Sequence, residues 1–404
     1  MLARIRIPGG LIATQQVRVL AEAAEQFADG SLDITARAGV QLRGIANESL
    51  QGLAEALAAA GLLPSPEHER VRNILANPFA GVDPQESIDV RPLVRELDAR
   101  LIADARLAAL PPRFAFALDG GGDFCASAKA DLALRAVVTA DGLRLHLLIG
   151  AEPAGYGVPP QAAVDALLAA AHAALTLAGS CNAPDHWRLA DLSGARSAIG
   201  SALAPYRAAC PSPSVPTNIA VPLGVLPAQR NHSANLVPTI PLGRLHASQA
   251  RGIADISERF QTDVRLAWWR GIVFAAVDRS SVPGVREALA RLGLVLDGSD
   301  GYAGIAACAG IDGCPAALAD VRADARSLAQ RLAGLPAAGD WSVNFAGCAK
   351  RCAMRTSVGV DLVATERGYD MLVGGTLVAA DICAPQAIDA ALGAHAARRA
   401  GALR

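Results

Sequence analysis

Residues 308–314 read Cys-Ala-Gly-Ile-Asp-Gly-Cys, and residues 348–352 read Cys-Ala-Lys-Arg-Cys. These two segments hold half of the eight cysteines of the 404-residue chain, namely Cys308, Cys314, Cys348 and Cys352. Cysteine thiolates are the ligands of iron–sulfur clusters, and four of them complete a 4Fe-4S cube. Two other interpretations stay open: structural zinc, whose cysteine pairs usually stand two to four residues apart, and unrelated buried thiols. The wide spacing of the first pair favours a cluster.

The residues around the four cysteines also suit a bulky inorganic group. Gly310 and Gly347 let the backbone turn where a Cβ atom would often clash. Pro315 follows Cys314 directly, which predicts the first position of a helix that extends to about Leu332. Cys314 would then lie at the positive end of that helix, where the thiolate form is favoured.

The composition is that of a globular protein large enough for two or three domains with sizeable cores. Hydrophobic residues make up 52% of the chain, charged residues 19%, and the formal net charge is −1. A nearly neutral chain has no global attraction to nucleic acid or anionic membranes. The first ten residues lack a signal-peptide pattern, and the longest apolar run, residues 166–179, is too short to span a bilayer. We therefore expect a soluble, cytoplasmic protein whose clustered thiols bind metal.

A strand–helix–strand–strand–helix pattern occurs twice, at residues 5–63 and 238–295. The two copies share one register of glycines and core residues, which pairs Gly10 with Gly243, Phe27 with Phe260, Gly39 with Gly271 and Leu57 with Leu289. Between the copies, residues 204–237 are rich in proline and predict an extended linker. Two half-units related in this way are expected to bury their sheets together as a pseudo-twofold body.

These features together resemble the sirohaem sulfite and nitrite reductase superfamily, whose cluster signature is Cys-x5-Cys followed by Cys-x3-Cys at about this separation. Chains of that superfamily repeat a ferredoxin-like half-domain followed by a larger cofactor domain. The resemblance implies an α+β fold with pseudo-twofold symmetry, built from tandem ferredoxin-like half-domains and two larger cofactor or substrate domains. The half-domains would be residues 1–64 and 238–298, the first sirohaem-domain-like domain residues 65–203, the linker residues 204–237, and the 4Fe-4S-binding domain residues 299–404.

Two arginines stand at positions where the superfamily has active-site arginines. Residues 35–41, Thr-Ala-Arg-Ala-Gly-Val-Gln, resemble its Thr-x-Arg-x-x-x-Gln strand, which implies an active-site role for Arg37. Residues 72–78, which hold Arg-Asn-Ile and then Asn-Pro, resemble a second segment and imply the same role for Arg72. An arginine in a desolvated pocket stays charged and can clamp a carboxylate with its planar fork of donors. The alternative for each is an ordinary surface ion pair. Weaker candidates for the same pocket are Arg6, Arg43 and Arg70.

Residues 110–115, Leu-Pro-Pro-Arg-Phe-Ala, differ from the Leu-Pro-Arg-Lys-Phe-Lys segment of the sulfite reductases. Arg113 replaces one lysine of that segment and Ala115 replaces the other. Reduction of sulfite or nitrite consumes protons, so the loss of an ammonium donor argues against that reaction. We therefore predict that Arg113 acts with Arg37 and Arg72 at the catalytic site, where the three arginines orient substrate carboxylates.

Within the superfamily the chain is similar to the precorrin-3B synthases of the aerobic cobalamin pathway. The likeness lies in its length, its Pro-Pro-x-Phe segment, the glycines of residues 120–122 and the Cys-Ala-Lys-Arg-Cys segment. It implies an O2-dependent monooxygenase of cobalamin biosynthesis, which hydroxylates a meso carbon of precorrin-3A and closes a γ-lactone. Precorrin-3A is a metal-free relative of sirohaem, so a sirohaem pocket without its haem can accept it.

The resemblance also implies cofactors and partners. The cofactors are a 4Fe-4S cluster on the four cysteines and a mononuclear non-haem iron, whose ligands the sequence does not identify. The partners are the tetrapyrrole, O2 and an external electron donor, either NADH through a reductase or a ferredoxin-like protein, since no dinucleotide-binding motif is visible. We expect a monomer. Two alternatives stay open: an assimilatory sulfite or nitrite reductase with sirohaem ligated by Cys352, and a non-catalytic protein that binds a cluster or a tetrapyrrole.

Overall fold

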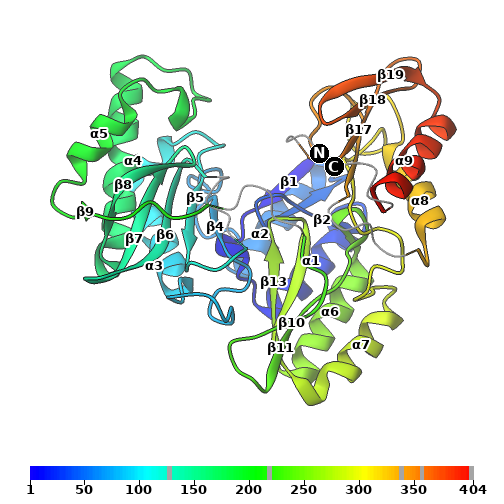
Figure 1. The fold of residues 1–404 in the computed structure, drawn as a ribbon, viewed down its shortest axis with the longest axis horizontal. Helices are drawn as coiled ribbons and strands as arrows, with labels where there is room; N and C mark the ends of the chain where they lie inside the picture. Colours follow the sequence, from blue (N-terminus) through cyan, green and yellow to red (C-terminus); the bar gives the residue numbers. More distant parts are fainter. Residues whose placement is uncertain (125–129, 216–220, 336–340, 355–358, 400–404) are drawn as a thin grey trace. The chain divides into compact units, whose positions relative to one another are not determined.

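In a computed structural model the chain forms two compact units that alternate along the sequence (Figure 1). The structure describes residues 1–124, 130–215, 221–335, 341–354 and 359–399. The first unit consists of Met1–Ile219, Val225–Leu236 and His246–Val285. The second unit consists of Ala220–Gly224, Val237–Leu245 and Arg286–Arg404. The three predicted catalytic arginines therefore belong to the first unit and the four cysteines to the second.

The first copy of the repeated pattern is an antiparallel sheet with two helices. Its strands are, in spatial order, β1 (Leu2–Ile5), β3 (Val40–Arg43) and β2 (Ser31–Ile34). Its helices are α1 (Thr14–Phe27) and α2 (Leu50–Ala59). The repeated pattern was predicted to begin with a strand at residue 5, whereas β1 ends at Ile5 and the segment Pro8–Gly10 forms a turn with two left-handed glycines.

The second copy repeats this arrangement. Its sheet has the strand order β10 (Gly224–Pro227), β11 (Ser233–Val237), β14 (Gly271–Asp278) and β13 (Asp263–Ala267). Its helices are α6 (Ala247–Phe260) and α7 (Val282–Arg291), and the short strand β12 (Arg244–His246) precedes α6. Residues 204–237, predicted as an extended linker, thus supply two strands of this sheet, and β11 is buried along its whole length.

The two copies share local backbone conformation as well as element order. Gly10 and Gly243 are both left-handed, with φ of 70° and 68°. Ala38 and Arg270, each one residue before a shared glycine, are left-handed too, with φ of 53° and 67°. At Gly10 a Cβ atom would come within 2.0 Å of the Leu266 carbonyl oxygen, so the close approach there requires glycine. Matched turns of this kind are what a duplicated sequence predicts.

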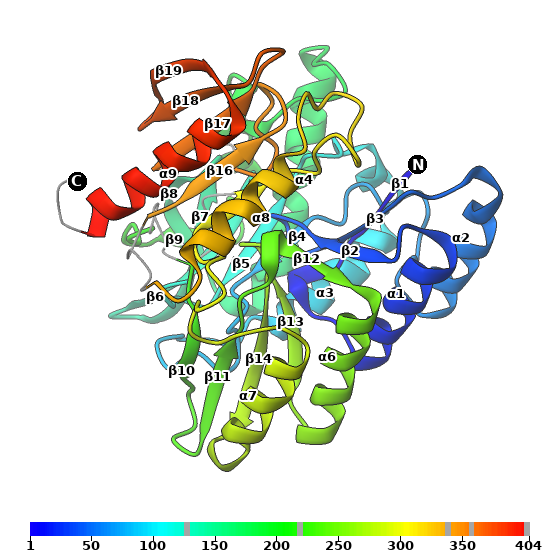
Figure 2. The same ribbon diagram turned by 90° about the vertical axis from the view of Figure 1, so that its right-hand side faces the viewer.

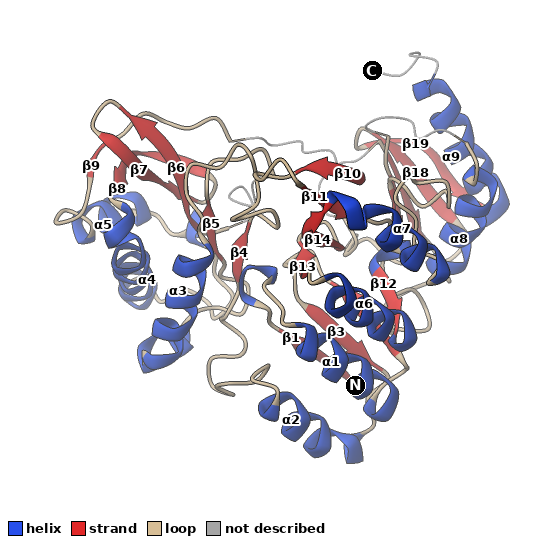
Figure 3. Cartoon of the chain, turned by 90° about the horizontal axis from the view of Figure 1, so that it is seen from below, coloured by secondary structure: helices blue, strands red, loops and turns tan. Residues whose placement is uncertain are grey.

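Helices α1 and α6 of the two copies lie side by side (Figure 2, Figure 3). Arg18 of α1 contacts Glu258 of α6 at 2.6 Å, and Arg251 of α6 contacts Glu25 of α1 at the same distance. Positions 18 and 251 correspond in the duplicated sequence, as do positions 25 and 258. The two ion pairs are therefore related by the pseudo-twofold symmetry of the repeat.

A larger sheet follows the first copy in the first unit (Figure 1). Its strand order is β4 (Ile74–Ala76), β5 (Phe116–Asp119), β6 (Leu132–Thr139), β7 (Gly142–Ile149), β8 (Glu152–Val158) and β9 (Ala208–Ala209). The first three strands are parallel, and each later strand is antiparallel to its neighbour. Apolar side chains of α3 (Arg91–Ala103), α4 (Ala163–Ser180) and α5 (Ala195–Ala202) pack with the sheet into the main core of this unit.

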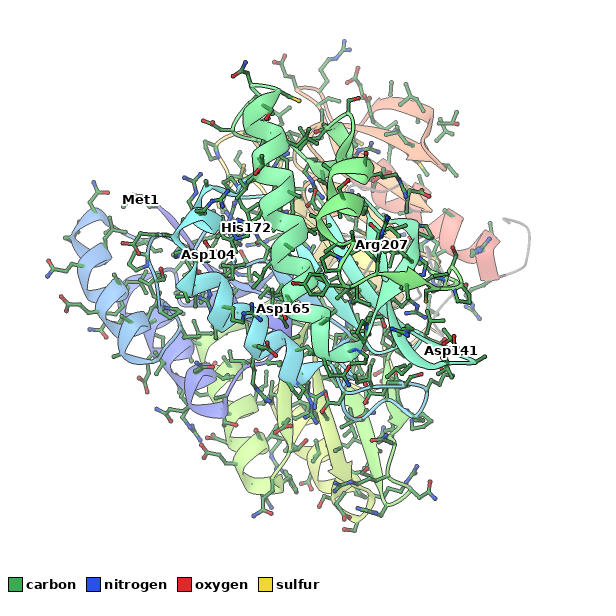
Figure 4. The ribbon with its side chains drawn as sticks, turned by 90° about the vertical axis from the view of Figure 1, so that its left-hand side faces the viewer. Met1, Asp104, Asp141, Asp165, His172 and Arg207 are labelled. Carbon is green, nitrogen blue, oxygen red and sulfur yellow. The ribbon has the colours of Figure 1, made fainter. Side chains whose placement is uncertain are left out.

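Helix α4 contains the apolar run that the sequence singled out. With the turn before it, Pro160–Ser180, it is the one segment among the described residues that could cross a membrane by length and composition. Half of its apolar window is buried inside the protein, and its buried side chains belong to the main core of the first unit. A hydrogen bond of 2.6 Å between His172 and Asp104, the residue after α3, and an ion pair of 2.7 Å between Asp165 and Arg100 also connect α4 to α3 (Figure 4 labels Asp104, Asp165 and His172). The run thus lies in a longer helix than predicted, and its packing identifies it as part of the core.

The second unit contains a five-stranded sheet with two helices. Its strand order is β15 (Ile305–Ala307), β16 (Val343–Ala346), β17 (Val360–Ala364), β18 (Tyr369–Val373) and β19 (Thr376–Ile382). The first three strands are parallel and the last two antiparallel. Helices α8 (Val321–Leu332) and α9 (Ala384–Arg399) contribute to its core, in which Phe345 and Leu362 are fully buried.

Candidate cluster-binding and anion-binding sites

Cys308 and Cys348 follow the carboxyl ends of two neighbouring parallel strands. Strand β15 ends at Ala307, directly before Cys308, and β16 ends at Ala346, two residues before Cys348. The strands pair in parallel register, and the Cys308 N–H donates to the Phe345 carbonyl at 3.1 Å. Because the carboxyl ends of parallel strands meet at one edge of a sheet, the two cysteine-bearing loops begin side by side.

Gly347 connects the two cysteine-bearing loops. Its N–H donates to Cys308 Sγ at 3.2 Å, and its carbonyl accepts from the Leu318 N–H at 2.8 Å. A Cβ atom at this position would come within 2.8 Å of Ala317 Cβ, so glycine is the residue that fits without a shift. Hydrogen bonds to the sulfurs help to set the reduction potential of a cluster. Gly347 therefore supports Cys308 as a thiolate ligand.

The helix predicted to begin at Pro315 begins later. Asp320 is its N-cap, since the Asp320 carboxylate accepts from the Ala323 N–H at 3.0 Å and α8 follows it. The residues between form turns, in which the Ala317 N–H donates to the Cys314 carbonyl at 3.0 Å. Aspartate is among the strongest N-cap residues, and here it outcompetes the proline signal. The prediction that Cys314 lies at a helix N-terminus is therefore wrong.

The four cysteines suit a cluster by their donor chemistry. Cys308, Cys314 and Cys348 are partly buried, and Cys352 is exposed. Among the described residues, no three His, Cys, Asp or Glu side chains converge on a single metal ion. That result concerns a mononuclear site, because in a cube each thiolate binds a different iron. The quartet thus fits a 4Fe-4S cluster, whereas the predicted mononuclear iron has no ligand set in the described part of the chain.

The sheet of residues 65–203 matches the cysteine-bearing sheet in strand direction. In β15–β19, and in β4–β8 of the larger sheet, three parallel strands are followed by two antiparallel ones. Residues that pair across the three parallel strands form a row, and the first rows of the two sheets can be matched. Ile74, Phe116 and Leu132 then correspond to Ile305, Val343 and Val360. Counting forward from these rows gives three further matches: Asn77 with Cys308, Asp83 with Cys314 and Gly121 with Cys348.

Asn77 and Asp83 take the places of the first cysteine pair in this matched sheet. Both side chains are buried, and Asn77 Nδ2 donates to Asp83 Oδ2 at 2.9 Å. A Cβ atom on Gly122 would come within 2.1 Å of that carboxylate oxygen, so the loop is packed closely around the pair. The equal spacing of Asn77 to Asp83 and of Cys308 to Cys314 is the sequence signal for this duplication. Element patterns alone do not predict it.

Arg37 lies in the turn between β2 and β3, not on a strand as its motif suggested. Its guanidinium donates to Asn73 Oδ1 at 3.1 Å and to two backbone carbonyls within 3.2 Å. All three acceptors are neutral. Burial, followed by the charges of Arg6, Arg188 and Arg113 among its neighbours, lowers the pKa of Arg37 to about 10. Such a group gains from a bound anion, so the turn is a candidate carboxylate-binding site.

Arg72, in contrast, is buried in a structural ion pair. Its Nε and Nη2 contact the two oxygens of Asp98 at 2.8 and 2.9 Å, and Nη1 contacts Glu69 at 3.1 Å. Burial alone would lower the pKa of Arg72, but hydrogen bonds and charges from Asp98 and Glu69 outweigh it and raise the pKa. The planar fork that was predicted to hold substrate is thus already occupied by protein carboxylates.

Arg113 is exposed and joins Arg37 in one cationic group, which we define as Arg6, Arg37, Arg113 and Arg188. The pKa of Arg6 is also lowered by burial. Arg188 was not predicted; its Nε contacts Asp131 at 2.9 Å, and it lies far from the other three in sequence. Of the remaining weak candidates, Arg43 pairs with Asp33 at 2.8 Å and Arg70 is exposed. The structure therefore brings Arg37 and Arg113 together, while Arg72 neighbours Arg6 with its own donors occupied by Asp98 and Glu69.

Two family models match the chain. The model described as nitrite/sulfite reductase ferredoxin-like half domain matches residues 1–60 and 227–292. The model described as nitrite and sulphite reductase 4Fe-4S domain matches residues 67–177. The double match of the half domain confirms the predicted tandem repeat. Residues 67–177 include Asn77 and Asp83, while the four cysteines lie outside the matched ranges.

The relatives that match most of this chain include proteins with two different enzyme names. The chain is 28% identical over 381 residues to a precorrin-3B synthase of Sinorhizobium sp, which covers 93% of this chain and 80% of the relative. It is 26% identical over 409 residues to a ferredoxin–nitrite reductase of Synechococcus elongatus, with the same two coverages. Among solved structures, the NirA protein of Mycobacterium tuberculosis has a similar fold, with a TM-score of 0.76 over 93% of this chain and 74% of that one, at 22% identity. These findings confirm the predicted α+β fold class.

Proposed function

The chain belongs to the nitrite and sulfite reductase superfamily, and we propose that within it the protein is a precorrin-3B synthase. Its relatives are oxidoreductases, and the Sinorhizobium relative matches it over most of both chains. The proposed reaction inserts one atom of O2 into precorrin-3A at a meso carbon, with closure of a γ-lactone. The second oxygen atom is reduced to water, and this reduction uses two electrons from an external donor and two protons.

The observation that supports a tetrapyrrole with several carboxylates as the ligand is the cationic group around Arg37. The hydrogen bonds of Arg37 end on neutral acceptors, and its charge is disfavoured by burial and by the arginines beside it. A ligand with several carboxylates would balance this charge, and each arginine–carboxylate contact would be a charge-assisted hydrogen bond. Precorrin-3A carries a fringe of acetates and propionates. We therefore assign Arg37 and Arg113 to orienting the carboxylates of the substrate.

Position 115 argues against the sulfite reductase alternative. The sulfite reductases have a lysine there, whereas this chain has Ala115, which is fully buried. Ala115 belongs to an apolar cluster with Leu75, Ala117 and Trp268. A charged ammonium would be costly among these side chains, so the matched position cannot supply a proton to a small oxyanion.

The four cysteines would hold a 4Fe-4S cluster, which supplies one-electron transfer when bound. Gly347, through its N–H contact to Cys308 Sγ, would help to set the potential of that cluster. We propose no step through a mononuclear iron, because the described residues offer no ligand set for it. We further propose an external electron donor, either NADH through a reductase or a ferredoxin-like protein, and a monomeric, cytoplasmic enzyme.

The test is incubation of the anaerobically purified protein with precorrin-3A, a chemical reductant and isotope-labelled O2. We expect a product heavier by one oxygen atom, with the label in the product. Arg37→Ala should bind precorrin-3A more weakly, while Arg43→Ala serves as a matched control, because Arg43 is already paired with Asp33. Binding of precorrin-3A without any gain of oxygen would reject the synthase activity and favour the alternative of a non-catalytic protein that binds a tetrapyrrole.

The ferredoxin–nitrite reductase relative supports a second candidate function, that of a sirohaem-dependent nitrite or sulfite reductase. An absorption spectrum separates the two enzymes. A cluster alone gives a broad brown absorption, whereas sirohaem adds an intense Soret band and bands in the red. We expect the spectrum of a cluster alone, and a Soret band accompanied by nitrite or sulfite reduction would establish the reductase instead.

A further inference from the structure

A buried polar network connects the sheet of the second unit to the second cysteine-bearing loop. Asp361 on β17 and Asn344 on β16 are both 0% exposed. The Asp361 carboxylate accepts from Asn344 Nδ2 at 2.8 Å and from Arg351 Nη1 at 3.2 Å. Asn344 Nδ2 also donates to the Met354 carbonyl at 3.1 Å. We refer to Asn344, Arg351 and Asp361 as the anchor triad.

The anchor triad holds the loop at two points around Cys352. Arg351 lies between Cys348 and Cys352, and Met354 lies two residues after Cys352. The backbone at Arg351 is left-handed, with φ of 44°, and its N–H donates to the Cys348 carbonyl at 3.2 Å. A residue with a side chain rarely adopts this conformation, and it persists where the surrounding contacts hold it. The contact of Arg351 with Asp361 is such a contact.

The matched sheet of residues 65–203 shows that the fold itself does not need the triad. Row matching pairs Asn344 with Ala117, Asp361 with Ala133 and Arg351 with Phe124. Ala117 and Ala133 are buried in an apolar cluster, where no buried charge has to be compensated. A buried carboxylate is expensive unless it is paired and hydrogen-bonded. Since the same strand arrangement forms with apolar residues, Asp361 needs an explanation beyond folding, and the cysteine-bearing loop that it contacts through Arg351 offers one.

We propose that Asn344, Arg351 and Asp361 are positioning residues that hold the segment from Cys348 to Cys352 in a preformed, cluster-ready conformation. The inference rests on the proposed 4Fe-4S site. The triad fixes the turn that carries two of the four thiolates, Cys348 and Cys352. Mutation of residues that orient metal ligands in this way typically lowers metal affinity about 10–100-fold.

The first experiment measures how fast the full-length protein loses iron to a chelator after anaerobic cluster reconstitution. Arg351→Met removes the Arg351–Asp361 contact, and Asp361→Asn removes its charge and one of its two acceptor oxygens, so we expect iron loss to be about 10–100-fold faster than in the wild type. Arg351→Lys should give an intermediate rate, because lysine keeps the charge without the planar fork. The matched control is Arg331→Met, which removes an exposed ion pair with Asp389 at 2.6 Å in the same unit and should leave the rate unchanged.

A second set of variants separates positioning from general stability. Arg351→Gly suits the left-handed backbone but lacks the side chain. We expect it to lose iron as fast as Arg351→Met, and iron loss at the wild-type rate would overturn the role of the side chain.

The triple variant N344A/R351F/D361A copies the matched sheet, and we expect cooperative unfolding but a changed or absent electron paramagnetic resonance signal of the reduced cluster. A wild-type signal and a wild-type rate of iron loss in a folded triple variant would reject the proposal. If instead the wild-type protein binds no iron and Cys308→Ser changes nothing, the cluster site itself is rejected.

Discussion

Asn77 donates a hydrogen bond to Asp83 at 2.9 Å, and the two residues occupy the positions that Cys308 and Cys314 hold in the other large sheet. The spacing is identical in both sheets, and both loops leave the carboxyl end of the first of three parallel strands. One copy of the duplicated loop therefore closes with an amide and a carboxylate, and the other presents two thiols. The hydrogen bond links the two ends of its loop, where the proposed metal ligation would link the ends of the other loop.

Asn77→Ala should destabilise the protein without affecting its iron. The change leaves the buried Asp83 carboxylate with one fewer donor, although the Gln85 N–H still donates to it at 3.0 Å. We expect a loss of about 1–2 kcal/mol in the free energy of unfolding, measured by urea denaturation. Iron per chain should equal that of the wild type. Loss of iron from folded Asn77→Ala would show that this loop contributes to cluster binding.

Replacement of any cluster cysteine by serine should abolish the cluster. A serine hydroxyl is a poor substitute for a thiolate, so Cys308→Ser and Cys348→Ser should fall well below about four irons per chain. Cys383 and Cys181 are exposed thiols elsewhere in the chain, and their serine variants serve as controls with unchanged iron. Iron and acid-labile sulfide assays check both sets. A full complement of iron in Cys348→Ser would contradict the quartet.

Arg37 and Arg72 should respond differently to the same change. Arg37→Ala removes a cation that donates to neutral acceptors, so we expect weaker binding of precorrin-3A with little change in thermal stability. Arg72→Ala leaves Asp98 and Glu69 without their partner in a buried setting, which should cost about 3 kcal/mol of stability. Thermal unfolding and substrate titration of both variants check this contrast. A stable Arg72→Ala protein with weakened substrate binding would restore the role that its motif implied.

The parts of the fold that could be predicted from sequence are those where geometry restricts residue type directly. The cysteine spacing and the shared glycines are of this kind, since thiolate ligands and left-handed turns tolerate few substitutions. Gly39 and Gly271 mark equivalent turns, and Gly347 is required by its contact with Ala317. These signals led to the superfamily fold and to the tandem repeat, which the family models confirm.

The ion-pair partner of an individual charged side chain could not be predicted in the same way. Arg72 matches an active-site motif, but its fork is filled by Asp98, which stands on α3 and carries no local signal of that pairing. The start of α8 was missed for a related reason, because Pro315 and Asp320 are both acceptable helix starts and tertiary contacts decide between them. Arg188 joined the cationic group through long-range packing alone.

Glu86 should make the stability of the protein decrease as the pH rises. Its Oε2 is buried without a hydrogen-bond partner in the described structure, and burial raises the pKa of Glu86 to about 7. The folded pKa lies above the unfolded value of about 4.3, so the contribution of the neutral acid is fully present below that pH and is lost as the pH rises through about 7. Glu86→Gln keeps the shape of the side chain without its charge. The difference in the free energy of unfolding in favour of Glu86→Gln over the wild type should grow by about 1–2 kcal/mol between about pH 5 and pH 8.

Urea unfolding across this pH range checks the trend, with exposed Glu48→Gln as the control. An advantage of Glu86→Gln that is constant with pH would mean that Glu86 titrates in the folded protein as it does in the unfolded chain.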